Sequence, residues 1–281
     1  MSGPKPWPIG ISTGIYYNRP ILTTLPRIAA SGVRLLEICS FPAHFNYHDS
    51  ALAQQVRREI EARGLVVHSL HAPFSPQIDI TLLDDDARRQ AVVEVKRAAE
   101  ALATLGGRVL VIHPGSEIGQ DAHRMMERLH RSADSLNELH SHCAALGLTL
   151  AVEDMLPHLL AGRTADLLWL LEQLPNDHVG FCLDTGHAYL ARELIQRIDL
   201  FGPWLLLLHA SDTHGSYDDH LPPGEGAINW QDVVHALRRV GFNGAMILEV
   251  AGREDEEGLW RSVQRSVEYL RDLTGGTTPS R

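Results

Sequence analysis

The sequence predicts a single (β/α)8 TIM barrel, an α/β fold with its active site at the C-terminal ends of the strands. Eight short apolar runs recur along the 281 residues, helix-type spacing separates them, and no linker of domain size interrupts the series. Since such a barrel needs about 250 residues, one domain over residues 1–281 accounts for the chain. We expect an ordered barrel over 7–273 and a flexible tail at 275–281.

The predicted strands are near-continuous apolar runs, as expected for strands of a parallel sheet covered by helices. They span residues 7–14, 33–40, 65–72, 108–115, 148–155, 178–185, 204–211 and 244–251. Residues 49–63 and 84–105 carry apolar residues three and four apart, which predicts amphipathic helices. Gly64, Gly106 and Gly147 stand where helix C-termini need a left-handed residue.

Composition excludes several classes of function. The formal net charge of −10 argues against a polyanion as the main partner, because nucleic-acid binding relies on Lys and Arg. The two lysines, Lys5 and Lys96, do not follow strands, which excludes a Schiff-base enzyme.

The chain carries no signal of export or of membrane insertion. Neither a signal peptide nor an apolar run of membrane-spanning length is present. Three cysteines without a CxxC pair indicate reduced thiols, so we expect a cytoplasmic protein. The five tryptophans are expected in the core or between helices, and the sequence defines no oligomeric state.

Imidazole and carboxylate side chains follow almost every predicted strand from the third onward. They are His71, His113, Glu153, Asp184, His187, His209 and Glu249, with Asp218 and His220 in a later loop. Strand ends of a barrel meet at one mouth, and these are the ligands that Zn²⁺, Mn²⁺ and Fe²⁺ prefer. Clustered carboxylates repel one another without a cation, so the pattern predicts a divalent metal site.

Within this set, Glu153, Asp184, His209 and Glu249 are the predicted principal metal ligands, and the other five are predicted additional ligands. Three further side chains are candidates for substrate contact together with His71, His113 and His187. His44 lies in the loop after the second strand, on the catalytic face, and Phe74 follows the third strand. Glu37 precedes the tip of the second strand, where it either lines the barrel mouth or is a polar residue of the core.

The chain resembles the xylose isomerase-like TIM-barrel superfamily over almost its whole length. This superfamily includes the sugar phosphate isomerases and epimerases and the endonuclease IV family. The motifs that carry the resemblance are HAPF (71–74), IHPG (112–115), VED (152–154), CLDTGH (182–187), HASD (209–212), DDHLPPGEGAINW (218–230) and ILEV (247–250). The segment DHLPPGEGAINW, followed by a helix and GFNGAMILEV, is most similar to the bacterial sugar isomerase and epimerase branch.

Each branch implies its own use of these residues. In the epimerase branch, one Mn²⁺-like ion is held at the positions of Glu153, Asp184, His209 and Glu249. The two glutamates act as acid and base, and His187 contacts substrate. In the endonuclease IV branch, three Zn²⁺ ions are held by nine residues. The corresponding sets here are His71, His113 and Glu153; Glu153, Asp184, His209 and Glu249; and His187, Asp218 and His220.

Loop composition favours the first branch. Endonuclease IV proteins present basic loop residues to DNA, whereas residues 40–50 and 210–229 contain no Lys or Arg. We therefore expect no nucleic-acid partner. Ketose epimerases of this branch usually carry an arginine shortly after the position of His209, and residues 210–226 have none. Dehydratase and lyase reactions of a keto-polyol at the same site are therefore alternatives to epimerisation.

The sequence therefore predicts a divalent-metal-dependent isomerase or epimerase of a small sugar or keto-polyol. The reaction expected is proton abstraction by Glu153 or Glu249 through an enediolate. The expected cofactor is Mn²⁺ or Zn²⁺, one to three ions per chain. The alternatives are a tri-zinc phosphodiesterase like endonuclease IV and a dehydratase or lyase.

Overall fold

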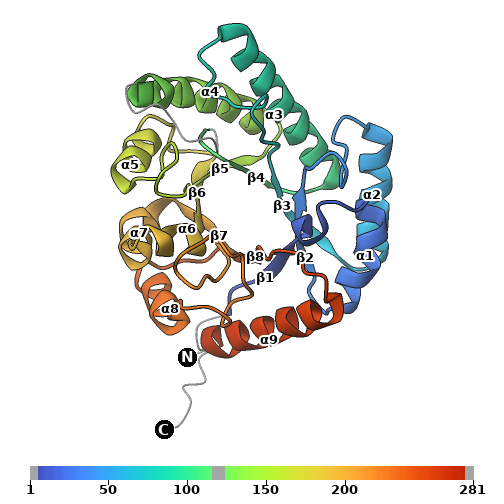
Figure 1. The fold of residues 1–281 in the computed structure, drawn as a ribbon. Helices are drawn as coiled ribbons and strands as arrows, with labels where there is room; N and C mark the ends of the chain where they lie inside the picture. The colour runs from blue at the N-terminus through green and yellow to red at the C-terminus, as the bar shows by residue number, and fades with distance from the viewer. Residues whose placement is uncertain (1–5, 116–123, 276–281) are drawn as a thin grey trace.

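The computed structural model describes residues 6–115 and 124–275 of the chain. Eight parallel strands form a closed barrel in sequence order, with β1 paired to β8 (Figure 1). The strands are β1 Ile9–Ser12, β2 Leu35–Cys39, β3 Val66–His71, β4 Val109–Ile112, β5 Thr149–Glu153, β6 Val179–Asp184, β7 Leu205–Ala210 and β8 Ala245–Leu248. This arrangement confirms the predicted (β/α)8 barrel.

Helices surround the strands as an outer ring (Figure 1). The α-helices are α1 Ile21–Ala30, α2 Ser50–Ala62, α3 Asp85–Leu105, α4 Met125–Ala145, α5 Thr164–Glu172, α6 Thr185–Leu190, α7 Leu194–Phe201, α8 Trp230–Arg239 and α9 Glu256–Thr274. Short 3₁₀ helices, η1 Thr13–Tyr16 and η3 Gly202–Trp204, follow β1 and precede β7. No helix in the two described ranges is long and apolar enough to cross a membrane.

Local signals set the observed boundaries. Every observed strand lies inside its predicted range but is shorter, because the apolar runs extend into the adjoining loops. Helix α3 begins after Asp84, whose side chain caps it by accepting the N–H of Ala87, and it ends at Gly106 with a φ of 80°. A left-handed residue there closes the last turn of the helix, as predicted. The predicted tail lies outside the described residues beyond Gly275.

The barrel interior holds a small apolar layer directly beneath the mouth. Among its members are Val111, Ala151, Cys182, Leu207 and Ile247. Side chains two residues apart on a strand face the same way. The residues two positions later therefore face the barrel axis as well, and these are His113, Glu153, Asp184, His209 and Glu249. The register of the strands therefore places these five predicted ligands in one layer at the C-terminal end of the barrel.

Candidate metal centre and active site

The structure brings the predicted ligands into three groups at the C-terminal end of the barrel. In each group, one possible ligand atom from every residue lies within 4.8 Å of the others. The groups are His71, His113 and Glu153; Glu153, Asp184, His209 and Glu249; and His187, Asp218 and His220. All nine predicted residues therefore take part, and Glu153 belongs to two groups.

The central group converges on the imidazole of His209. The Nδ1 atom of His209 lies 2.8 Å from Glu153 Oε1 and 2.8 Å from Glu249 Oε2. Asp184 pairs with His209 in the sheet register, so its side chain lies beside this imidazole. Glu153, Asp184 and His209 are buried, whereas the side chain of Glu249 is 26% exposed. Glu249 is therefore the group's most accessible carboxylate.

The second group lies on the other carboxylate oxygen of Glu153. His71 Nε2 is 3.2 Å and His113 Nε2 is 3.4 Å from Glu153 Oε2. Phe74 covers these two imidazoles, with ring centroids 4.6 Å from His113 and 5.3 Å from His71. Since Phe74 is 45% exposed, it forms an apolar edge of the barrel mouth next to the candidate ligands.

The third group joins the end of β6 to the loop that follows β7. His187 Nε2 and His220 Nε2 lie 3.2 Å and 3.0 Å from Asp218 Oδ2. His187 is in the first turn of α6, which Asp184 caps by accepting the His187 N–H at 2.8 Å. At Gly186, a Cβ atom would lie 2.7 Å from Ser211 Oγ, so a larger residue here would have to displace this hydroxyl group.

The histidine rings are oriented as metal ligands usually are, with one nitrogen on an oxygen outside the group and the other facing the carboxylates. His71 Nδ1 lies 3.0 Å from Ala72 O, and His187 Nδ1 lies 2.8 Å from Asp154 O. His220 Nδ1 lies 3.3 Å from Glu249 O. The Nε2 atoms of all three rings therefore point into the groups, and this set of nitrogen and oxygen donors fits Zn²⁺ or Mn²⁺.

The same proximity perturbs the acid–base groups. Burial works to raise the pKa of Glu249, but His209 outweighs it and brings the pKa to about 2. Burial raises the pKa of Asp184 to about 6. Burial lowers the pKa of His71 and His220, but Glu153 raises the first to about 9, and Asp218 with Glu249 raises the second to about 10. Without a metal ion, protons bound to the histidines therefore supply the positive charge that the carboxylates need.

Two of the predicted substrate contacts lie elsewhere. Glu37 is fully buried behind His209, with Oε2 3.1 Å from His209 Nε2, so it lies inside the barrel below the mouth. His44 is 3% exposed, and its Nδ1 lies 2.6 Å from Arg19 O, which fastens the loop after β2 to the loop after β1. The contact of Glu37 joins two strands that are distant in sequence, and the contact of His44 joins two loops.

Several residues of the site were not predicted. Cys182 forms a group of possible ligand atoms with Glu153 and His209, from inside the barrel. Arg197 is a fully buried arginine from α7 that pairs with Asp154. The VED motif contains Asp154, but nothing in the sequence around Arg197 distinguishes it from the surface arginines.

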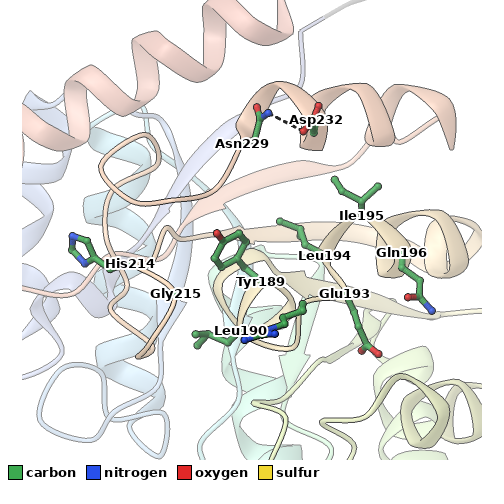
Figure 2. A pocket seen from close by; sticks show the side chains of 11 residues that line it. Tyr189, Leu190, Glu193, Leu194, Ile195, Gln196, His214, Gly215, Asn229 and Asp232 are labelled. Atoms are coloured by element: carbon green, nitrogen blue, oxygen red, sulfur yellow. Dashed lines mark hydrogen bonds between the residues drawn. The ribbon is translucent and has the colours of Figure 1, made fainter.

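A pocket of about 610 Å³ lies between α6, α7 and the loop that follows β7. Tyr189 of α6, Leu194 and Ile195 of α7, and His214 of the loop after β7 line it (Figure 2). None of the nine candidate ligands is among its lining residues. The pocket is therefore separate from the layer of candidate ligands in which the carboxylates converge.

Comparisons with known proteins agree with this architecture. A family model described as a xylose isomerase-like TIM barrel matches residues 25–273. An uncharacterised protein of Methanocaldococcus jannaschii is 25% identical over 247 residues, 85% of this chain and 82% of that protein. "Probable endonuclease 4" of Mycobacterium leprae is 25% identical over 227 residues, 77% of this chain and 82% of that protein. The structure of D-psicose 3-epimerase with D-tagatose from Clostridium cellulolyticum H10 has a TM-score of 0.82 at 19% identity, covering 95% of this chain and 99% of that chain.

Proposed function

The chain belongs to the xylose isomerase-like TIM barrel family, and from this premise we propose that it is a divalent-metal-dependent isomerase or epimerase of a small sugar or keto-polyol. The observation that carries the proposal is the convergence of Glu153 and Glu249. One carboxylate oxygen of each lies 2.8 Å from His209 Nδ1, although the two residues come from β5 and β8. Two carboxylates at one point suit proton transfer at a single carbon.

The residues proposed to hold the ion are Glu153, Asp184, His209 and Glu249, with the other two groups available for further ions. A bound Mn²⁺ or Zn²⁺ supplies Lewis-acid polarisation of a carbonyl and its neighbouring hydroxyl, which acidifies the C–H between them. Among the contacts of the described residues, no Lys or Arg side chain reaches the three groups. This absence favours an unphosphorylated substrate.

Glu153 and Glu249 are the proposed catalytic pair. One carboxylate accepts the proton from carbon, and the electron pair of the C–H bond becomes part of the enediolate. The other glutamate enters the step as a protonated carboxyl group. It gives its proton to the opposite face of the same carbon, which inverts the centre, or to the neighbouring carbon, which moves the carbonyl. His187 orients a substrate hydroxyl, and Phe74 covers the apolar face of the substrate.

Solvent exchange tests this proposal. The metal-loaded protein is incubated with free ketoses, their phosphorylated forms and keto-polyols in D₂O, and the products are analysed by NMR and mass spectrometry. We expect deuterium at the abstracted carbon of an unphosphorylated compound. Product without deuterium points to a hydride shift and contradicts the enediolate route. Loss of water from the product assigns the dehydratase or lyase reaction of the same site.

A second candidate is a phosphodiesterase with three bound ions. The group of His187, Asp218 and His220 supports it, because an epimerase with one ion does not need these ligands. The three groups of ligands would hold the ions, which would supply an activated water and would stabilise the leaving oxygen of a phosphodiester. Mass spectrometry of the metal content and cleavage of DNA with an abasic site decide the matter. Three zinc ions with cleavage support the phosphodiesterase, and one ion without cleavage eliminates it.

A further inference from the structure

We infer that Glu37 is a positioning residue for the candidate metal centre. It fixes the tautomer and orientation of His209, so that Nδ1 presents its lone pair to the ion. This inference rests on the metal site of the proposed function, but it does not depend on the identity of the substrate.

The contact joins two fully buried side chains across the barrel. Glu37 stands on β2 and His209 on β7, and Glu37 Oε2 lies 3.1 Å from His209 Nε2. The other ring nitrogen, Nδ1, faces Glu153 and Glu249 at 2.8 Å. The imidazole therefore lies between one carboxylate behind it and two in front of it.

The direction of the hydrogen bond follows from elementary chemistry. A neutral imidazole has one N–H, and a carboxylate can only accept. The hydrogen therefore belongs on Nε2, where it is donated to Glu37, and Nδ1 keeps its lone pair for the ion. A carboxylate acceptor also makes the opposite nitrogen more basic, which strengthens it as a ligand. With the opposite tautomer, Nδ1–H would face the ion.

Glu37 has few hydrogen-bond partners apart from His209. Oε2 also accepts a hydrogen bond from Ser69 Oγ at 2.8 Å, whereas Oε1 is buried without a hydrogen-bond partner. No arginine or lysine pairs with this carboxylate among the described residues. An oxygen that is buried without a hydrogen-bond partner costs stability, so the contribution of Glu37 to the fold alone does not explain this residue.

The test compares Glu37→Met, which removes the acceptor, with Glu37→Gln, whose amide oxygen still accepts from Nε2. Ser69→Ala is the matched control, because it removes the other hydrogen bond of the same oxygen. Affinity for Co²⁺ and Zn²⁺ is measured by calorimetry after chelation, and the visible spectrum of the Co²⁺ protein reports the ligand geometry. Melting temperatures of the chelated proteins report the fold.

We expect Glu37→Met to weaken metal binding about 10–100-fold and Glu37→Gln less than about 10-fold. The Co²⁺ spectrum should change for Met and stay the same for Gln. Ser69→Ala should match the original protein in affinity and spectrum. The chelated Glu37→Met protein should still unfold in one cooperative transition, which shows that its fold is intact.

Unchanged affinity and spectrum in Glu37→Met overturn the inference while leaving the metal site intact. Equal losses in Ser69→Ala and Glu37→Met also overturn it, because the effect is then one of packing. If Glu37→Met does not fold, Glu37→Leu takes its place as the variant without an acceptor, and an affinity equal to that of the original protein in this variant refutes the role. If the original protein binds neither ion, the inference and the proposed metal-dependent function fall together.

Discussion

The buried guanidinium of Arg197 lies 2.7 Å from Oδ2 of Asp154. Asp154 directly follows the candidate ligand Glu153 in the chain. Asp154 also accepts the N–H of Asp184 at 2.7 Å, and its carbonyl oxygen lies 2.8 Å from His187 Nδ1. This single residue therefore ties helix α7 to three candidate ligand positions. The pair supports the metal centre from behind without facing the mouth.

Arg197→Met should destabilise the protein severely. It leaves the buried carboxylate of Asp154 without its cation, which costs about 3–5 kcal/mol. Arg239→Met is the control, because Arg239 pairs with Asp199 at the surface, where such a pair contributes about 0.2–1 kcal/mol. Urea unfolding of both variants measures the difference. Equal losses would show that Asp154 does not need Arg197.

Glu249→Gln should lower the turnover of an identified substrate by about 10²–10⁴-fold, because the amide cannot act as a base. Weaker metal binding adds to this loss. Glu257→Gln is the control, since Glu257 lies exposed on α9, where it pairs with Arg27 of α1. Steady-state kinetics and metal analysis are measured together. Near-normal activity with full metal content in Glu249→Gln would remove this residue from the mechanism.

Asp212→Asn should disorganise the loop that carries Asp218 and His220. The buried Asp212 carboxylate accepts four hydrogen bonds of 2.9–3.1 Å, from the N–H groups of Thr213, Gly224 and Ile228 and from Trp230 Nε1. An amide nitrogen cannot accept, so each donor left alone costs about 1–3 kcal/mol.

Limited proteolysis should then cut the Asp212→Asn protein within residues 213–229 faster than the original. Asp232→Asn is the control, because Asp232 is exposed on α8 and its change should stay within about 0.5 kcal/mol. If cleavage rates are equal in all three proteins, Asp212 does not organise this loop.

The chelated protein should lose stability as the pH rises. The pKa of His71, about 9, and that of His220, about 10, lie above the ordinary value of 6.5. A raised pKa in the folded state contributes stability that is complete below 6.5 and is lost as the pH rises through the folded pKa. Melting temperatures in chelator should therefore fall between about pH 6.5 and 10.

Saturating Zn²⁺ should remove this fall, because the ion displaces the protons and binds more tightly at higher pH. Replacing both His71 and His220 by Gln should make the fall shallower, while the raised pKa values of His187 and His209 keep part of it. A melting temperature that rises over this window in chelator would show that these histidines are neutral in the fold.

Much of the architecture could be predicted from the sequence. Apolar runs and turn residues are local signals, so the eight strands and the glycine that ends α3, Gly106, appear where they were expected. The rule that barrel strands end at one mouth then placed nine ligand-type residues together. The sequence therefore identified the residues of the candidate centre but not their arrangement in space.

Only the tertiary structure decided how these residues use their atoms. The inward position of Glu37 behind His209, the pairing of Arg197 with Asp154 and the packing of His44 on Arg19 O all join elements distant in sequence. Periodicity reports which face of a strand is buried, but it does not report which side chain lies across the barrel. The sequence therefore determined which groups gather at the mouth, whereas closure of the barrel determined which nitrogen or oxygen each group presents.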